Sequence, residues 1–297
     1  MARAYAILDV FTRTPLAGNA LAVVYDGRGL DSVRMQAIAR ETNLSETVFV
    51  LPPADPAQRA RLRIFTPAAE LPFAGHPTVG TAVALALQDG GGDRRFILGE
   101  EIGPVDCEVR IEGEHTGWAR FRLPKLPYDA GAAAPVEKLA AALGLEADEI
   151  GFAGHRPSRW GVGAPFTMVP LRDREALSRA AIVPAAWAEA FGSDRHNAAF
   201  LYVRGGTEGG DFRTRMYCPG MGIGEDPATG SAVASFAGLL MQTERPGDGE
   251  HAFLIEQGFE MGRPSLIELG LSIAGGQLAS ATIAGGAVRI ADGILYA

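Results

Sequence analysis

Two loops of the chain carry polar residues in a spacing suited to acid–base chemistry. Each loop has the frame Glu-x-Pro-x-x-Gly, and a polar residue follows the glycine: His76 follows Gly75, and Ser231 follows Gly230. An uncharged run comes after each loop, which predicts a helix beginning near the glycine. Because the first backbone N–H groups of a helix have no partner within it, each helix start could hold a carboxylate or a developing enolate.

The two loops differ at one position, where only the second has an acid. Asp226 precedes the proline of the second loop, whereas Leu71 precedes the proline of the first. Since the loop does not require an acid there, Asp226 is a candidate functional residue. A simpler interpretation stays open, because the helix dipole stabilises a nearby carboxylate by about 0.3–1 kcal/mol. Likewise, Ser231 could be an ordinary helix cap and His76 a packed turn histidine.

A third candidate, Glu46, opens an apolar run. In a strand over Glu46-Thr47-Val48-Phe49-Val50 its side chain would share a face with Val48 and Val50. A carboxyl group on an apolar face is harder to ionise than one in water, which suits a group that both takes and gives a proton near neutral pH. The alternative is a solvated glutamate at the mouth of the strand.

Charge patterning indicates the elements that must position these residues. Two stretches half a chain apart, 71–88 and 227–243, contain no Asp, Glu, Lys or Arg, so each predicts a helix that is buried on every side. The likeness of the two halves extends upstream, where the segment 63–67 (RIFTP) resembles 215–219 (RMYCP), and more weakly downstream, at 95–100 and 251–256. The pattern therefore predicts one domain plan used twice.

Most other segments predict strands. The expected strands are 5–10, 20–25, 47–51, 105–111, 118–123, 166–170, 200–203, 265–271 and 277–283, and the expected amphipathic helices are 32–42, 136–143 and 174–180. Many strands around one buried helix per half predict an α+β fold of two pseudo-symmetric domains, each with a curved, mostly antiparallel sheet around a central helix. The proline-rich stretch 124–135 divides the domains into 1–124 and 125–297, and the last strand could return to the first domain.

Composition excludes several classes of function. The chain has 297 residues, of which 47% are hydrophobic and 21% charged, so it is long enough for two globular domains. A net charge of −8 without a basic run argues against nucleic acid as a partner. Cys107 and Cys218 are too few for a disulfide framework and lack zinc spacing. With no signal peptide or membrane span in the pattern, we expect a cytoplasmic protein. His155 could meet a substrate carboxylate, but we expect it to be a solvated surface residue.

Four stretches together carry a resemblance to a known family. The sequences DVFTRTPLAGNALAVV, NLSETVFV, RIFTPAAELPFAGHPTVGTA and GEDPATGSAVASFAGLL, followed by the weaker QGFEMGRPS, resemble those of the PhzF family of phenazine-biosynthesis isomerases. They span residues 9–264, and the FAGHP and EDPATGSA motifs are highly specific. The resemblance implies the diaminopimelate-epimerase-like fold, with the active site between two similar domains.

The resemblance also implies roles for the candidate residues. Glu46 in NLSET matches the catalytic acid/base of the family, and His76, Asp226 and Ser231 match the polar residues that bind substrate and assist proton movement. It further implies a homodimer and a proton-shift isomerisation without a cofactor.

We therefore expect a cofactor-independent isomerase acting on a small, cyclic carboxylate. Glu46 would move a proton between two carbons, with Asp226 and His76 as catalytic partners, Ser231, Gly75 and Gly230 as binding residues, and no metal. An amino-acid racemase or epimerase of similar fold is the first alternative, although such enzymes characteristically place cysteines at the two helix starts. A catalytically silent binding protein on the same scaffold is the second.

Overall fold

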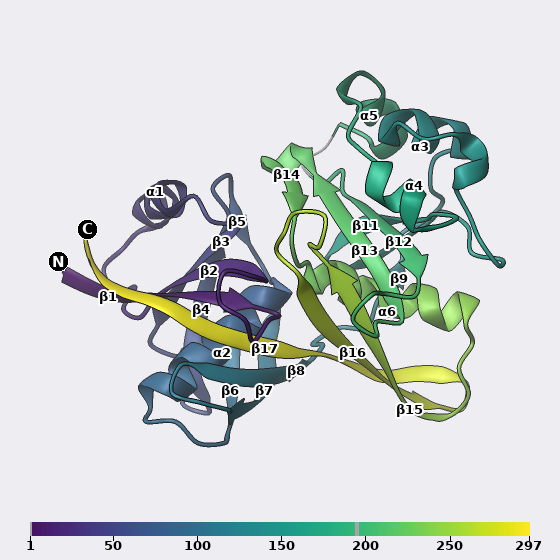
Figure 1. Ribbon diagram of the computed structural model, residues 1–297. Helices are drawn as coiled ribbons and strands as arrows, with labels where there is room; N and C mark the ends of the chain where they lie inside the picture. The colour runs from purple at the N-terminus through teal and green to yellow at the C-terminus, as the bar shows by residue number, and fades with distance from the viewer. Residues whose placement is uncertain (1, 194–195) are drawn as a thin grey trace. The chain divides into compact units, whose positions relative to one another are not determined.

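The computed structural model describes residues 2–193 and 196–297, which form two compact units (Figure 1). Unit 1 contains residues 1–124, 263–266 and 282–297, and unit 2 contains residues 125–262 and 267–281. The chain thus passes from unit 1 to unit 2 at Pro124 and Lys125, and its C-terminal segment belongs to unit 1.

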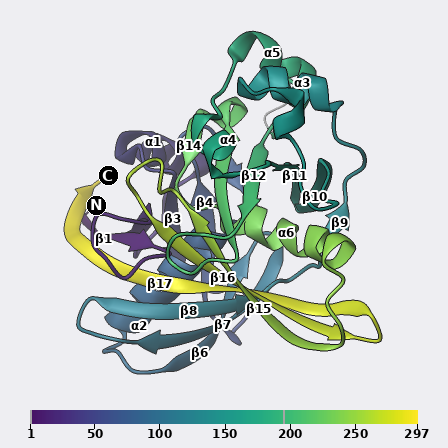
Figure 2. The same cartoon turned by 45° about the vertical axis from the view of Figure 1, so that its right-hand side comes forward.

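Unit 1 is a closed β-barrel. Its strands are β1 (Ala2–Val10), β2 (Asn19–Val24), β3 (Glu46–Leu51), β4 (Gln58–Phe65), β5 (Glu70–Leu71), β6 (Arg94–Glu100), β7 (Gly103–Ile111), β8 (Thr116–Arg122) and the later part of β17 (Gln277–Tyr296). Pairing runs β17–β1–β2–β3–β4–β6–β7–β8 and back to β17, with β2–β3 and β4–β6 parallel and the other pairs antiparallel. Figure 2 shows β17 running beside β8.

Helix α2 (Gly75–Gln88) fills the interior of this barrel. It contacts β1, β2, β3, β6, β7 and β8, and its residues from Gly75 to Ala86 are buried. Gly80 lies where the helix approaches the wall, since a Cβ atom there would come within 2.6 Å of side-chain carbons of Leu21 and Val10. The uncharged segment therefore forms a helix that is buried all round, as its composition predicts.

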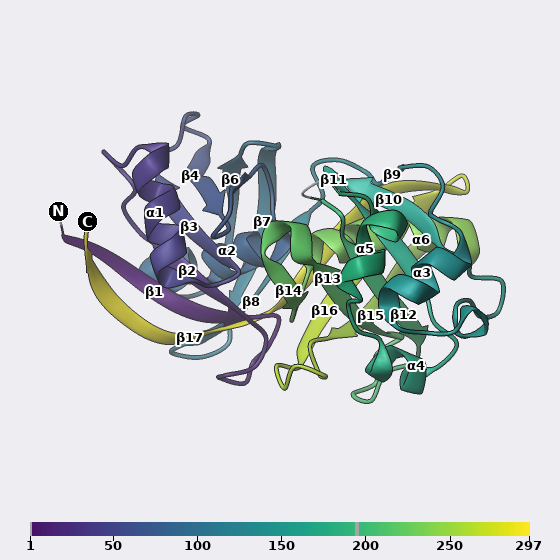
Figure 3. The ribbon, with the colours of Figure 1, turned by 90° about the horizontal axis from the view of Figure 1, so that it is seen from above.

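Helix α1 (Ser32–Thr42) covers part of the outside of the barrel (Figure 3). The Asp31 side chain accepts a hydrogen bond from the backbone N–H of Arg34 and caps the first turn. Residues of α1, Ile38 among them, form a cluster with Phe49 and Phe65, whose rings meet edge to face. Alternate residues of β3 thus face α1, which leaves the side chain of Glu46 on the opposite face.

Unit 2 is built on the same plan. Its strands are β9 (Tyr128–Asp129), β10 (Ser158–Val162), β11 (Ala164–Pro170), β12 (Ala199–Arg204), β13 (Phe212–Cys218), β14 (Ile223–Asp226), β15 (Gly249–Gln257) and most of β16 (Ser265–Ala274). Its helices are α3 (Val136–Leu143), α4 (Arg174–Arg179), α5 (Pro184–Phe191) and α6 (Gly230–Thr243), with short 3₁₀ turns at Ala147–Glu149 and Pro219–Met221. Helix α6 contacts β9, β10 and β11, and its Phe236 packs against aromatic rings of β12 and β13.

Strand pairing confirms the internal repeat. The series of parallel β2–β3, antiparallel β3–β4 and parallel β4–β6 pairs in unit 1 recurs as β11–β12, β12–β13 and β13–β15 in unit 2. In the strands before each central helix, Leu71 pairs with Ile64 and Asp226 pairs with Met216. Asp226 therefore occupies the register position that Leu71 has in unit 1.

A duplicated ion pair holds each of these short strands. The Arg63 guanidinium donates to both carboxylate oxygens of Glu70 at 2.6 and 2.5 Å, and that of Arg215 donates to both of Glu225 at 2.7 and 2.8 Å. Each guanidinium carbon also lies 5.1 Å from the ring centroid of the aromatic residue two positions on, Phe65 or Tyr217. These contacts give Glu70 and Glu225 a structural role.

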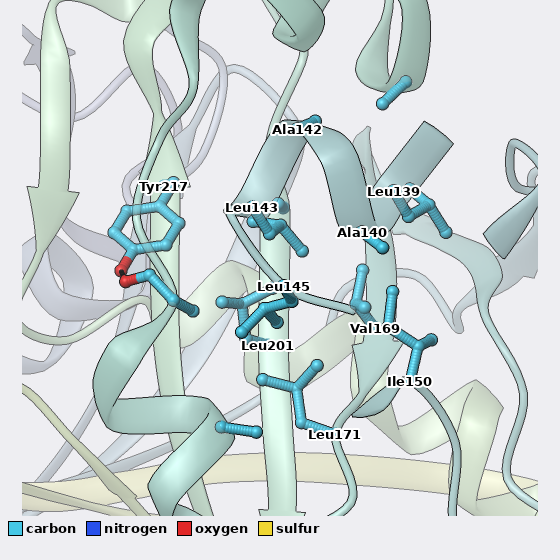
Figure 4. Close-up of a cluster of buried hydrophobic side chains, with 14 of the residues drawn as sticks. Leu139, Ala140, Ala142, Leu143, Leu145, Ile150, Val169, Leu171, Leu201 and Tyr217 are labelled. Carbon is cyan, nitrogen blue, oxygen red and sulfur yellow. Dashed lines mark hydrogen bonds between the residues drawn. The ribbon is translucent and has the colours of Figure 1, made fainter. Parts of the chain in front are cut away.

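The units differ in what covers their outer faces. In unit 2 the helices α3, α4 and α5 build a second apolar core against β11, β12 and β13, shown in Figure 4 around Leu143, Val169 and Leu201. The Tyr217 hydroxyl at the edge of this core donates to the backbone oxygen of Ala180 at 2.8 Å. Helix α5, which begins with Pro184 at its first turn, is absent from the sequence-based expectations.

Candidate active site

The starts of both central helices lie where the sequence predicts them. Helix α2 begins at Gly75 and α6 at Gly230, so His76 and Ser231 are each the second residue of a helix. The N-cap residues are Ala74 and Thr229, and neither side chain makes a capping hydrogen bond. Ser231 is therefore not the N-cap of α6, and neither N-cap residue uses its side chain to satisfy the first backbone N–H groups of its helix.

In unit 1 the structure brings Glu46 and His76 together. Oε2 of Glu46 lies 3.1 Å from Nε2 of His76, and the two residues are only 8% and 3% exposed. The separation is that of a hydrogen bond, but the atoms are not aligned for one. Such misalignment is common in catalytic pairs before substrate binds. The solvated position that was the alternative for Glu46 is excluded by its burial.

Burial sets the charge of His76. Desolvation lowers the pKa of His76 from 6.5 to about 3, so the imidazole is neutral throughout the physiological range. A neutral imidazole has one N–H donor and one nitrogen acceptor. His76 can therefore donate a hydrogen bond to a carboxylate or substrate without contributing a full positive charge.

Asn19 completes this buried group. Its side-chain nitrogen Nδ2 lies 3.4 Å from Nδ1 of His76, and the residue is 1% exposed. No local signal marks Asn19 as a site residue, although it lies inside the stretch DVFTRTPLAGNALAVV. Its partner is 57 positions away, so only the pairing of strands around α2 brings the two side chains together.

A second buried carboxyl, Glu100, contacts the first turns of α2. Its Oε1 lies 2.7 Å from the hydroxyl of Thr78, which is also 2.8 Å from the backbone oxygen of Ala74. Burial raises the pKa of Glu100 to about 8, so the protonated acid is the main form at neutral pH. The hydroxyl has one proton, and both contacts are satisfied when Glu100 donates to Thr78 and Thr78 donates to Ala74.

The sequence offered a weak signal for Glu100, because the repeat aligns it with Glu256. The two carboxyls have different environments. Glu256 accepts from the backbone N–H groups of Thr207, Glu208 and Gly210 and from Arg213, and these contacts lower its pKa although burial opposes the shift. Glu256 is thus an ionised structural carboxylate, whereas Glu100 has no such set of donors among the described residues.

In unit 2 a hydrogen-bonded network holds Asp226. The Thr229 hydroxyl donates to Oδ2 of Asp226 at 2.5 Å, and Nε2 of Gln257 donates to the backbone oxygen of Asp226 at 2.8 Å. Gln257 also accepts from the backbone N–H of Thr229 and donates to its hydroxyl. Asp226 is 4% exposed, so its carboxyl has a fixed, mostly desolvated position just before α6.

The structure corrects the expectation for His155. This residue is 3% exposed rather than solvated, with Nδ1 3.0 Å from the Tyr202 hydroxyl and Nε2 3.0 Å from a carboxylate oxygen of Glu244. Its ring also stacks on Phe152. The error has a simple cause: the local sequence around His155 is polar and glycine-rich, and the partners that bury it lie 47 and 89 positions away.

Other expectations concern membranes, cysteines and metals. Within residues 2–193 and 196–297 no helix combines the length and apolar character that crossing a bilayer requires. Cys107 and Cys218 are buried in strands β7 and β13, and neither is in the first turn of a central helix. In the same part of the chain no group of three or more His, Cys, Asp or Glu side chains is placed to hold a metal ion.

Comparison with solved structures defines the class of the fold. A PhzF-family phenazine biosynthesis protein of Bacillus anthracis aligns with a TM-score of 0.88 over 100% of both chains at 22% identity. A hydroxyproline epimerase of Agrobacterium vitis aligns with a TM-score of 0.68 over 99% of this chain and 92% of its own, at 12% identity. The chain therefore has the α+β, diaminopimelate-epimerase-like fold.

Sequence comparison defines the family. Residues 8–293 match the PhzC-PhzF model, described as phenazine biosynthesis-like protein, and the chain belongs to this family. It is 49% identical to an uncharacterized isomerase of Mesorhizobium japonicum, with 99% of both chains covered. It is 35% identical to the trans-2,3-dihydro-3-hydroxyanthranilate isomerase of Pseudomonas aeruginosa, over 98% of this chain and 99% of that protein. The chain is an isomerase.

Proposed function

We propose that this isomerase moves a proton within a small, cyclic carboxylate, with Glu46 as the acid/base and without a cofactor. The observation that carries the proposal is the buried pair in unit 1, in which Glu46 Oε2 lies 3.1 Å from His76 Nε2. The relative named for trans-2,3-dihydro-3-hydroxyanthranilate supports a substrate of this class.

In the proposed reaction one residue, Glu46, both removes the proton and returns it. Ionised Glu46 takes a proton from one carbon of the substrate, and the electron pair left behind is delocalised toward a second carbon. Protonated Glu46 then returns the proton to that second carbon. No electron leaves the substrate and the enzyme ends in its starting state, so a positioned acid/base is sufficient.

Neutral donors would stabilise the charge that develops on the substrate. His76 is neutral because burial lowers the pKa of its imidazolium to about 3, so its one N–H group can donate to Glu46 or to the substrate without adding a positive charge. The backbone N–H groups at the start of α2, near Gly75, are not capped by the side chain of the N-cap residue and have the partial positive charge of a helix N-terminus. Donors that are fixed before the reaction need no reorganisation when charge appears.

The proposed reaction also uses residues of unit 2. Asp226 would assist proton movement, and Ser231 and Gly230 would bind the substrate. Support comes from the fixed carboxyl of Asp226, the position of Ser231 in the first turn of α6, and the occurrence of an acid where the repeat has Leu71. The homodimer and the cytoplasmic location stay predictions.

The racemase alternative receives no support from the helix starts. His76 and Ser231 stand there, whereas the cysteines lie in strands. Exchange of the α-hydrogen of an amino acid in deuterated water would revive this alternative.

The test of the proposal is product formation in deuterated water. The enzyme is incubated with trans-2,3-dihydro-3-hydroxyanthranilate and then with a panel of cyclic carboxylic acids, without added metal or cofactor. We expect isomerised product from the wild type and none above background from Glu46→Gln, and the deuterium content of the new C–H position measures how far the proton held by Glu46 exchanges with solvent before it is returned. Glu41→Gln, an exposed glutamate on α1, is the matched control. Wild-type turnover by Glu46→Gln would end the assignment.

A further inference from the structure

Asn19 is a buried amide that the proposed mechanism does not use. It opens β2, where it pairs with Val10 of β1, and its Nδ2 approaches Nδ1 of His76. The other ring nitrogen of His76, Nε2, faces the carboxyl of Glu46. The three side chains thus form a series from Asn19 through the imidazole to Glu46, entirely within unit 1.

The chemistry of these groups selects one arrangement of protons. An amide nitrogen can only donate, so Nδ1 of His76 must be the acceptor. In a neutral ring the proton must then be on Nε2, the ring nitrogen that lies 3.1 Å from Oε2 of Glu46. The other tautomer would place an N–H against the amide N–H of Asn19 and a lone pair against the carboxylate, and both contacts would be repulsive.

The turn before Asn19 is held in place by an ion pair. Arg263 donates to Oδ1 of Asp9 at 2.6 Å and to the backbone oxygens of Ala17 and Gly18 at 2.7 Å each. Gly18 has φ +64°, and a Cβ atom there would lie 2.3 Å from the backbone oxygen of Val10, so the turn requires glycine. The Arg263–Asp9 ion pair and the turn at Gly18 therefore help to set the position of Asn19, in addition to its contact with His76.

We propose that Asn19 is a positioning residue that fixes His76 in the tautomer with the proton on Nε2, and that it thereby keeps Glu46 in the ionised form that acts as base. The catalytic consequence rests on the proposed function, whereas the tautomer does not.

The direct test is a two-bond ¹H–¹⁵N correlation spectrum of the full chain with ¹⁵N-labelled histidine. The chain has five histidines, and the His76→Gln spectrum identifies the His76 signals by their loss. We expect unprotonated Nδ1 and protonated Nε2 for His76 near neutral pH in the wild type. A wild-type ring protonated on Nδ1 would overturn the proposal, whatever the behaviour of any variant.

Substitutions at Asn19 test the link to Glu46. An aspartate at this position can accept the ring proton, so Asn19→Asp should move it to Nδ1 and turn the Nε2 lone pair toward Glu46. Because a lone pair favours the protonated carboxyl, the acid limb of the kcat profile should shift to higher pH, and kcat near neutral pH should fall by at least about tenfold. Asn19→Ala removes the amide donor that favours the Nε2–H tautomer. We therefore expect a mixture of the two His76 tautomers and a kcat between those of the wild type and Asn19→Asp.

The variants also separate this proposal from the proposed function. If Asn19→Asp retains the Nε2–H tautomer or the wild-type pH profile, Asn19 does not set the state of the pair. If the tautomer changes as expected but Glu46→Gln retains turnover, the assignment of the His76 tautomer to Asn19 stands, whereas the acid/base role of Glu46 and the catalytic consequence of Asn19 fail.

Discussion

Glu46 Oε2 lies 3.1 Å from Nε2 of His76, and the two residues are 8% and 3% exposed. The two residues come from different elements: Glu46 opens strand β3, and His76 is the second residue of the helix inside the same barrel. A carboxyl in this position, beside a neutral imidazole, can take and return a proton where little water is present to compete.

The first prediction concerns the carboxyl itself. Glu46→Gln should lower kcat by about 10²–10⁴-fold, the usual contribution of a positioned acid/base, while the midpoint of thermal unfolding stays near that of the wild type. The rate of product formation and thermal unfolding, measured on the same samples, check both parts. Glu41→Gln should leave both quantities unchanged.

The second prediction is an acid-sensitive contribution of His76 to stability. Its pKa is about 3 in the folded protein and near 6.5 when unfolded, so the unfolded chain binds an extra proton between these values. The stability therefore falls as pH drops from 6.5 toward 3, by up to about 1.4 kcal/mol per pH unit from this group. His76→Asn should flatten the slope of unfolding free energy against pH in that window. His115→Asn, which changes an exposed histidine, should preserve it.

The third prediction is an opposite slope from Glu100. Burial raises its pKa from 4.5 to about 8, so the folded chain retains a proton that the unfolded chain has lost between these values. The contribution of this group to stability falls as pH rises from 4.5 to 8. Glu100→Gln should be more stable relative to wild type at pH 8 than at pH 5, as determined by urea unfolding. An equal difference at both pH values would contradict a protonated Glu100, and the exposed neighbour in Glu101→Gln serves as control.

The fourth prediction compares the duplicated ion pairs. Arg215 donates to the backbone oxygens of Leu177, Ser178 and Ala180 in addition to Glu225. Among the described residues, Arg63 adds the Ser32 hydroxyl to its bonds with Glu70 and no backbone oxygen. Arg215→Ala should therefore lower the free energy of unfolding by about 3–5 kcal/mol, the range for a broken buried ion pair. The loss for Arg63→Ala should be smaller by roughly 1–2 kcal/mol. Chemical denaturation determines the order, and equal losses would show that the carbonyl contacts do not matter.

The fifth prediction addresses Asp226. Asp226→Asn keeps an oxygen that can accept from Thr229, so the fold of unit 2 should be preserved, but the ionisable group is lost. We expect a fall in kcat of at least about tenfold with little change in unfolding temperature. If only KM rises, Asp226 binds substrate and takes no part in proton movement.

The sequence alone determined the plan of the protein. Two uncharged segments behind a repeated Glu-x-Pro-x-x-Gly frame were enough to predict two buried helices in two similar halves, because a helix without a polar face must be enclosed. Helix α1, at Ser32–Thr42, and helix α3, at Val136–Leu143, also begin and end where local signals placed them. The glycine before His76 and Ser231 put both residues in the first turn of a helix.

The tertiary structure decided which polar side chains lose water and which partners they meet. Four features of the site depend on residues that are distant in sequence. They are the burial of Glu46, the contact of Asn19 with His76 across 57 positions, the burial that keeps Glu100 protonated, and the enclosure of His155. Periodicity reports the face of an element on which a residue lies, but not the side chain that packs opposite. For Glu46, Asn19 and His76 that choice is made when the strands of unit 1 close around α2, because closure brings β2 and β3 against the same helix.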